Sequence, residues 1–160
     1  MYYTNHMIIK LPEIVKLNLA GKVVGLTSGC YDLIHFYHLH YFERCKAECD
    51  FLIVGVDSDQ LLSDFKSKPA CIPEYHRARM VEAMSCVDAV FTLRNLTQLE
   101  EATRFSHKLF KNLPELYGKP IVMDPTQCKL VVIPDVEEIT STSSIIAKIR
   151  EEGVTIPNPS

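Results

Sequence analysis

The apolar run at residues 51–56, FLIVGV, is the feature that most constrains the fold of this chain. A strand exposed on one face alternates apolar and polar side chains, whereas a strand covered on both faces is apolar throughout. A second apolar run lies at residues 23–26, and helix-like patterns separate such runs along the chain. The sequence therefore predicts a parallel sheet with helices packed against both of its faces.

The predicted strands and helices alternate over most of the chain. Strands are expected at residues 22–27, 51–56, 89–93, 120–123 and 129–133. Helices are expected at residues 11–19, 37–49, 58–62, 73–86, 98–110 and 141–151. This order predicts a single α/β domain with an open parallel sheet of about five strands. Its expected divisions are an N-terminal extension with a short helix at 1–21, the folded domain at 22–152 and a frayed tail at 153–160.

Length, charge and cysteine spacing exclude several classes of protein. A chain of 160 residues suffices for one well-buried domain and is short for two. The net charge of −3 offers no basic surface for nucleic acid or an anionic membrane. No apolar run approaches the roughly 18 residues that span a bilayer, and the first residues lack the pattern of a signal peptide. The six cysteines are not spaced as a disulfide framework, so reduced thiols in a cytoplasmic protein are expected.

Residues 29–38, GCYDLIHFYH, place a glycine turn and two histidines directly after the first predicted strand. Backbone N–H groups at the start of a helix attract anions, and His35 and His38 add side-chain donors there. Such donors stabilise the charge that builds on a phosphoryl group during its transfer. The segment therefore favours a phosphate site with the two histidines at its centre.

Two alternatives for the histidines stay open. They are also consistent with a hydrogen-bonded pair that only orders the turn between strand and helix. A zinc site is the second alternative, because His40, Cys45 and Cys49 follow closely in the sequence. Zinc needs four convergent ligands, however, and the two cysteines fall on the apolar stripe of the predicted helix. The phosphate site is therefore preferred.

Three further segments carry groups that suit a bound triphosphate. Lys66 and Lys68 lie on a polar loop that is able to close over the β- and γ-phosphates. Arg77, near the start of a predicted helix, offers a bidentate contact to phosphate. The run TSTSS at 140–144 opens the last helix with hydroxyl and N–H groups. Each segment also has a purely structural alternative. The lysines are consistent with a solvated loop, Arg77 with a local pairing to Glu74, and the run at 140–144 with an ordinary helix cap.

Five segments in order resemble the cytidylyltransferase-like nucleotidyltransferases. Residues 29–38 are similar to the H-x-G-H segment of that superfamily, and FLIVGVDSD at 51–59 is similar to its LIVGVxSD strand. Further matches follow at 73–77 (PEYHR), 86–90 (CVDAV) and 139–142 (ITST). The resemblance covers about residues 22–150 and implies a Rossmann-like fold with helices on both faces of the sheet.

The resemblance also implies an activity. The segments GCYD and HFYH look most like ethanolamine-phosphate and choline-phosphate cytidylyltransferases, and glycerol-phosphate cytidylyltransferases share the motifs about equally. The preceding helix and AGK at 20–22 look more like heptose-phosphate adenylyltransferases. The implied reaction transfers CMP, favoured over AMP, from CTP or ATP to a small phosphorylated alcohol or sugar and releases pyrophosphate. Mg²⁺ held mainly by the triphosphate, no dedicated protein metal ligand, and a homodimer are implied as well.

Roles are carried over residue by residue. The resemblance places His35 and His38 on the α-phosphate as catalytic residues, and Lys66 reaches the phosphates as the third. Asp32 is expected to order the turn. The implied nucleotide-binding residues are Ser28, Gly29, Cys30, Tyr37, Lys68, Arg77, Asp124, Thr140, Ser141 and Thr142.

Three departures from the family pattern keep a second hypothesis open. Tyr37 stands where H-x-G-H has glycine, so a phenol occupies a position at which ligand approaches the backbone. Met123 replaces the glycine of a Gly-Asp pair, and the arginine before the closing motif is absent, with Asp135 following Pro134. The alternative function is therefore a catalytically impaired nucleotide- or metabolite-binding protein on the same fold.

Overall fold

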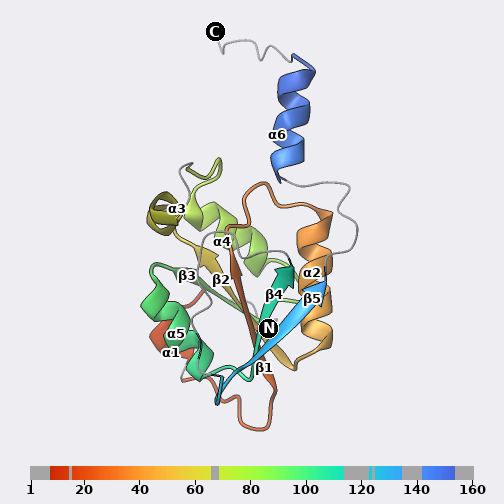
Figure 1. Ribbon diagram of the computed structural model, residues 1–160. Helices are drawn as coiled ribbons and strands as arrows, with labels where there is room; N and C mark the ends of the chain where they lie inside the picture. Colours follow the sequence, from red (N-terminus) through yellow and green to blue (C-terminus); the bar gives the residue numbers. More distant parts are fainter. Residues whose placement is uncertain are drawn as a thin grey trace, which may run out of the picture.

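The computed structural model describes residues 8–14, 16–65, 69–113, 123, 125–134 and 142–153. In chain order the elements are α1 (Leu11–Ile14), β1 (Val24–Gly29), α2 (Phe36–Ala47), β2 (Phe51–Asp57), α3 (Asp59–Phe65), α4 (Glu74–Glu82), β3 (Ala89–Leu93), α5 (Leu96–Arg104), β4 (Lys108–Leu113), β5 (Lys129–Pro134) and α6 (Thr142–Glu151). The strands of this described part form a five-stranded parallel sheet in the order β3-β2-β1-β4-β5 (Figure 1). The predicted α/β, Rossmann-like architecture is confirmed.

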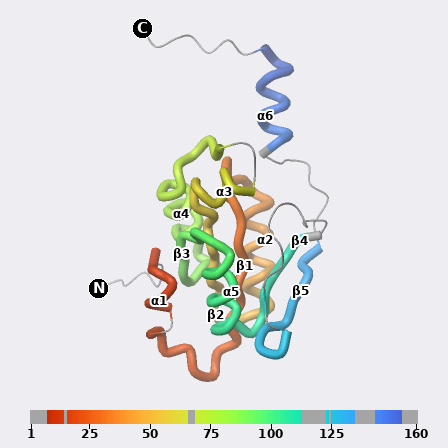
Figure 2. The backbone as a smooth tube through the Cα atoms, turned by 60° about the vertical axis from the view of Figure 1, so that its left-hand side comes forward, coloured from red at the N-terminus to blue at the C-terminus, as the bar shows by residue number. Residues whose placement is uncertain are grey.

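The strand order reverses beside β1. From β1 the chain moves outward to β2 and β3, and it then returns to the other side of β1 for β4 and β5. At such a switch point the loops that leave neighbouring strands diverge, and a crevice opens at the carboxyl ends of the strands. In sheets of this topology the ligand crevice therefore lies at the carboxyl end of the strand where the order reverses, which here is β1. Helix α6 stands beyond this same edge of the sheet (Figure 2).

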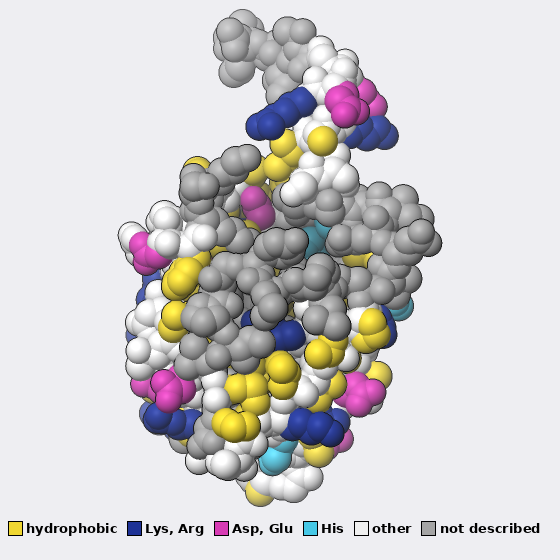
Figure 3. Space-filling view, viewed as in Figure 1, with side chains coloured by type: hydrophobic (Ala, Val, Ile, Leu, Met, Phe, Trp, Pro, Cys, Tyr) yellow, Lys and Arg dark blue, Asp and Glu magenta, His cyan; other side chains and the backbone are white. Residues whose placement is uncertain are grey.

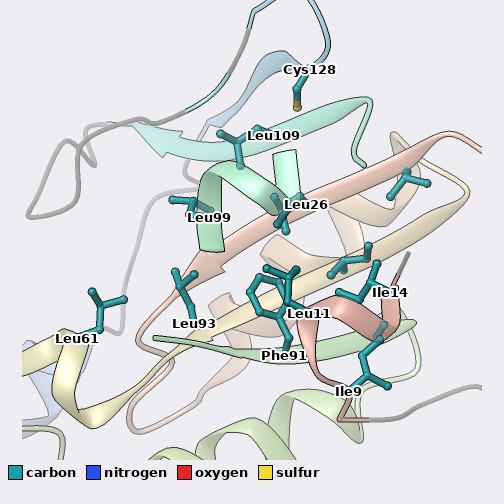
Figure 4. Close-up of a cluster of buried hydrophobic side chains, with 14 residues drawn as sticks. Ile9, Leu11, Ile14, Leu26, Leu61, Phe91, Leu93, Leu99, Leu109 and Cys128 are labelled. Atoms are coloured by element: carbon teal, nitrogen blue, oxygen red, sulfur yellow. The ribbon is translucent and has the colours of Figure 1, made fainter. Parts of the chain in front are cut away.

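Buried apolar side chains form one cluster on each face of the sheet. The cluster that includes α1 and α5 (Figure 4) consists of Ile9, Leu11, Ile14, Val24, Leu26, Ile53, Leu61, Ala89, Phe91, Leu93, Leu99, Ala102, Leu109 and Cys128. The cluster that includes α2 and α4 consists of Tyr31, Phe42, Cys45, Leu52, Val54, Val56, Ala78, Val81, Val87, Val90, Phe110 and Ile133. Strand β2 contributes to both clusters, as its uninterrupted apolar sequence predicts.

The N-terminal segment covers the outer edge of β3. Ile8 forms a parallel bridge with Val90, and the N–H of Ile9 donates to the carbonyl of Val90 at 2.8 Å. Leu11 and Ile14 of α1 then bury their side chains in the core. Residues 8–14 are thus packed on the sheet, and the bridge at residue 8 covers part of the exposed edge of β3.

The helix predicted at residues 98–110 is wrong in its second half. Helix α5 ends at Arg104, and the chain re-enters the sheet as β4. The hydroxyl of Ser106 donates back to a carbonyl of α5, and the N–H of His107 donates to Val24 at 2.8 Å. Pairing of β4 with β1 on one side and β5 on the other buries Leu109 and Phe110, and this outweighs the local helix-like pattern. Of the strand predicted at 120–123 only residue 123 is described, and it lies outside any strand.

Candidate active site

His35 and His38 cap the N-terminus of α2 reciprocally. His35 is the N-cap residue, and its Nδ1 accepts a hydrogen bond from the N–H of Tyr37 at 3.3 Å. The Nδ1 of His38 accepts from the N–H of His35 at 3.1 Å, and the two ring centroids lie 4.2 Å apart. This is a capping box in which imidazoles take the places of the usual hydroxyl and carboxylate. The sequence of the first turn therefore fixes both rings before any ligand arrives.

These hydrogen bonds determine where the imidazole protons lie. Because each Nδ1 accepts a hydrogen bond, the proton of a neutral ring is on Nε2. Burial, and then the neighbouring His35, lower the pKa of His38 to about 4. His38 is therefore neutral near pH 7 and presents an Nε2–H donor. A neutral donor of this kind suits an anionic phosphate oxygen, and it sits at the positive end of the α2 dipole.

The loop between β1 and α2 is strained. Tyr31 and Leu33 have φ angles of 54° and 46°, a left-handed conformation that non-glycine residues rarely adopt. The Tyr31 ring packs edge-on to His38 with centroids 5.9 Å apart. A Cβ on Gly29 would lie 2.9 Å from Cζ of Tyr31, so the glycine makes room for that ring. Strain of this kind persists where the surrounding structure imposes it, which is common at ligand sites.

Arg77 is a buried clamp at the carboxyl edge of the sheet. Its Nη1 donates to the carbonyl oxygens of Cys30 at 2.7 Å and Asp57 at 2.8 Å. Its Nε donates to the carbonyl of Ile72 at 2.8 Å, and Nη2 donates to the Asp59 carboxylate at 2.7 Å. Four of the five guanidinium N–H donors are thus engaged by the protein. One side chain therefore joins the ends of β1 and β2 to the segment that precedes α4.

Asp32 reinforces the same connection. Its carboxylate accepts hydrogen bonds from the N–H groups of Cys71 at 2.7 Å and Ile72 at 3.0 Å. Asp32 thus has the structural role that the sequence predicts, although the backbone it orders is that of the neighbouring segment. Glu74, which the alternative interpretation pairs with Arg77, instead forms an ion pair of 3.4 Å with Arg94.

A cavity of about 380 Å³ opens beside the histidines. Its lining comes from the β1–α2 loop, the segment before α4, α4 itself and the first turn of α6. The lining residues are Tyr31, Leu33, Ile34, Ile72, Arg77, Met80 and Ile145. Figure 3 shows hydrophobic side chains at the lower end of α6, where this helix faces the body of the protein. Of these residues only Arg77 was predicted as a site residue from the sequence, because the apolar side chains that line the cavity carry no motif.

Tyr37 lies in the first turn of α2, next to Phe36 and His35. Its ring centroid is 5.3 Å from that of Phe36 and 6.1 Å from that of His35. Its backbone N–H takes part in the cap, and the described residues that line the cavity do not include it. The phenol that replaces the family glycine therefore lies beside the site.

The structure brings several of the predicted site residues to one corner of the sheet. Ser28 and Gly29 end β1, and Cys30 follows with its carbonyl bound by Arg77. The backbone of Thr142 begins α6. The remaining predicted residues, Lys66, Lys68, Asp124, Thr140 and Ser141, lie outside the described residues.

The described part of the chain holds no cluster of three or more His, Cys, Asp or Glu residues that would bind a metal ion. Cys45, which the zinc alternative requires, is fully buried, and desolvation raises its pKa to about 12. Its side chain packs in the apolar cluster on the α2 face of the sheet, as the apolar stripe of the predicted helix implies. Within the described residues, no helix is both long and apolar enough to cross a bilayer.

Comparison with known proteins identifies the family. Residues 26–157 match the model of the cytidylyltransferase-like family. The chain belongs to this family. The matched range contains β2 to α6 and the histidine pair, so the predicted resemblance is confirmed over most of the chain.

Curated relatives in this family include two bifunctional proteins HldE. That of Campylobacter fetus subsp. fetus (strain 82-40) is 29% identical over 144 residues, which are 89% of this chain and 31% of the relative. That of Helicobacter pylori (strain P12) is 30% identical over 148 residues, which are 92% of this chain and 32% of the relative. The chain thus spans about a third of the length of these relatives.

A solved structure supports the fold. The lipopolysaccharide core biosynthesis protein from Thermoplasma volcanium GSS1 superposes with a TM-score of 0.54 at 16% sequence identity. The match covers 85% of this chain and 93% of that protein. At this identity the likeness bears on the architecture alone, and it agrees with the parallel sheet described above.

Proposed function

We propose that this protein is a nucleotidyltransferase. It transfers CMP or AMP from CTP or ATP to a small phosphorylated alcohol or sugar, and it releases pyrophosphate. The observation that carries the proposal is the reciprocal capping of His35 and His38 at the switch point of the sheet. It directs two fixed imidazoles toward the place where a Rossmann-like sheet binds its ligand.

The chemistry requires little covalent help from the protein. An oxygen of the acceptor phosphate bonds to the α-phosphorus, the bond to the bridging oxygen breaks, and its electron pair leaves with pyrophosphate. Negative charge spreads over the non-bridging oxygens in the transition state. The Nε2–H groups of His35 and His38 and the positive end of α2 oppose this charge. Because the cap holds the rings in place, they need no reorganisation during the reaction.

Magnesium is part of the proposal as an ion held mainly by the triphosphate. Among the described acidic residues, two at the carboxyl edge already have partners: Asp59 pairs with Arg77, and Asp32 accepts two backbone N–H groups. Phosphate oxygens and water are the ligands that Mg²⁺ commonly takes in such sites. When bound, the ion neutralises charge on the phosphates. A homodimer and a cytoplasmic location stay predictions.

Pyrophosphate release tests the proposal directly. The protein is incubated with CTP, ATP, UTP or GTP and with phosphoethanolamine, phosphocholine, glycerol 3-phosphate or a sugar phosphate. We expect release with CTP or ATP and one class of acceptor, and the donor that reacts decides between the two bases. Nucleotide binding without release across the whole panel would contradict the proposal.

A nucleotide-binding protein without turnover is the second candidate. The observation that favours it is Tyr37, whose ring lies 6.1 Å from that of His35 where the family has no side chain. Tyr37→Gly distinguishes the two candidates. If the phenol blocks turnover, the variant gains pyrophosphate release; if the site is active as it stands, the rate changes little or falls.

A further inference from the structure

The cavity and the crevice expected at the switch point of the sheet are formed by different connections between strands. The crevice of a switch-point sheet opens between β1 and β4, where the strand order reverses. The cavity instead takes Ile72 and Met80 from the connection between β2 and β3. Tyr31 links the two, since its ring lines the cavity and packs against His38. The cavity is therefore distinct in its lining from the switch-point crevice, and Tyr31 connects it to the histidine pair.

The wall of the cavity is chemically uniform. Five of its seven lining residues are aliphatic or methionine: Leu33, Ile34, Ile72, Met80 and Ile145. The remaining two, Tyr31 and Arg77, bring an aromatic ring and a guanidinium. The charge of Arg77 is matched by Asp59 at 2.7 Å, and its other donors hold backbone carbonyls. The described lining thus favours contact with the hydrocarbon part of a ligand over contact with its hydroxyl groups.

Two further observations mark this wall as a place for a ligand. Both left-handed residues of the loop, Tyr31 and Leu33, line it, so the backbone strain is concentrated at the cavity. Met80 is 54% exposed although it is a large apolar side chain, and Ile145 of α6 lines the same cavity. A ligand between them would cover apolar surface that water now contacts, and methionine adapts its shape to such a ligand.

We propose that this cavity receives the second substrate and selects a phosphorylated alcohol that carries an apolar group. The inference rests on the proposed function: the phosphate of the acceptor lies at the histidines, and its hydrocarbon portion lies against Leu33, Ile72 and Met80. A polyhydroxylated sugar would lose water from its hydroxyl groups against a wall that offers them few partners. The volume of about 380 Å³ is at the lower end of the range for small-molecule sites.

Calorimetric binding of phosphate monoesters to the full chain tests this inference. The probes are inorganic phosphate, glycerol 3-phosphate, n-propyl phosphate and n-pentyl phosphate, all without nucleotide. We expect affinity to rise about threefold for each added methylene that is buried. We also expect n-propyl phosphate to bind more tightly than glycerol 3-phosphate, which has the same number of carbons. Equal or tighter binding of glycerol 3-phosphate, or no dependence on chain length, would overturn the inference.

A pair of variants on α4 locates the binding site. Met80→Gln is expected to reduce the affinity for n-pentyl phosphate about threefold to tenfold and to leave inorganic phosphate unchanged. Tyr75→Gln is the matched control, because Tyr75 is 62% exposed on the same helix and does not line the cavity. Circular dichroism confirms that both variants fold. If Met80→Gln weakens CTP or ATP binding and leaves n-pentyl phosphate unchanged, the cavity holds the base and the inference is wrong.

Different results would contradict the proposed nucleotidyltransferase activity and the proposed acceptor cavity. Chain-length-dependent binding without any pyrophosphate release would support the acceptor cavity and contradict the nucleotidyltransferase. Pyrophosphate release with sugar phosphates, together with no preference for alkyl phosphates, would support the transferase and contradict the apolar acceptor.

Discussion

The amino and carboxyl edges of the sheet satisfy their backbone groups in different ways. At the amino edge, where strands begin with unpaired N–H groups, three separate side chains accept hydrogen bonds. The carboxylate of Asp50 accepts from the N–H of residue 23 at 2.7 Å, and Nδ1 of His107 accepts from that of residue 24 at 3.0 Å. The carboxylate of Asp88 accepts from the N–H of residue 52 at 2.8 Å. Each of these N–H groups has its own acceptor side chain, so the loss of one acceptor leaves the other two hydrogen bonds formed, although Lys46 links Asp50 to Asp88.

At the carboxyl edge a single side chain donates hydrogen bonds to backbone carbonyls of three segments. Arg77 binds the carbonyls of Cys30, Asp57 and Ile72, and the histidines and the cavity lie around it. At the amino edge, several side chains therefore each make a small contribution to stability. The carboxyl edge instead makes the geometry of the site depend on one buried cation. Substitutions at the two edges should therefore have different effects.

Arg77→Met is expected to have the largest effect. It leaves three carbonyls without their donor, and the loss of one partner in a buried network typically costs about 3–5 kcal/mol. We expect a lower free energy of unfolding in urea and loss of activity together. Arg77→Lys should not rescue, because an ammonium group does not reproduce the planar fork. The control is Arg94→Met at a 61% exposed side chain, expected to cost less than about 1 kcal/mol. Equal effects of the two methionine variants would contradict the clamp.

His38→Ala separates chemistry from stability at the same edge. Loss of one fixed donor should lower kcat by about 10²–10³-fold, whereas loss of the cap should cost only about 1 kcal/mol of unfolding free energy. His40→Ala, one half-turn further along α2, is the matched control. Parallel losses of melting temperature and rate in His38→Ala would support the purely structural alternative for the pair.

Two glycines of β1 offer the same substitution at opposite ends of one strand. A Cβ on Gly25 would meet Phe110 and, at 2.8 Å, Sγ of Cys49 in the core. Gly25→Ala should therefore cost about 1–3 kcal/mol of stability and leave kcat of the folded protein unchanged. Gly29→Ala should displace Tyr31 from beside His38, and so it should lower kcat more than stability. Denaturant titration and initial rates on both variants check the contrast; a reversed pattern would contradict the division between the edges.

Asp88→Ala is expected to have the smallest effect. Its carboxylate accepts from the N–H of residue 52 and pairs with Lys46, and it is only 19% exposed. Removal should cost about 1–2 kcal/mol. The kinetic parameters should not change, because the residue lies at the edge opposite the site. A change in kcat/KM at constant folded fraction would show that the amino edge also shapes the site.

The sequence predicts most of the sheet, since apolar runs such as FLIVGV leave few options. It fails at β4, where Leu109 and Phe110 are adjacent and Lys108 and Lys111 flank them, a spacing also compatible with a helix. Only pairing with β1 and β5, remote in sequence, makes this segment a strand.

Site residues could be predicted from the sequence where the type of side chain indicates the chemistry. They could not be predicted where the role depends on backbone groups that only the fold brings together. Two histidines after a glycine turn were predicted from residue type, and the structure has them together at the N-terminus of α2. Nothing in PEYHR shows that three carbonyls meet around Arg77, so its clamp role was missed. The left-handed Tyr31 and Leu33 were missed for the same reason, because tertiary packing and not composition imposes their conformation.

The central claim is that His38 is a neutral Nε2–H donor to a bound phosphate, and NMR of its ring nitrogens tests it most directly. An unfolded chain binds a proton on this ring near pH 6.5, whereas the folded protein does so near pH 4. Stability should therefore fall as the pH drops through this window, by at most about 1.4 kcal/mol per pH unit. We expect the Nε2–H tautomer from pH 5 to 8, about one unit above the pKa upward, and a shift of the Nε2 signal on addition of a non-hydrolysable CTP or ATP analogue. An Nδ1–H tautomer, titration near pH 6.5, or an Nε2 signal that the analogues leave unmoved would contradict the account.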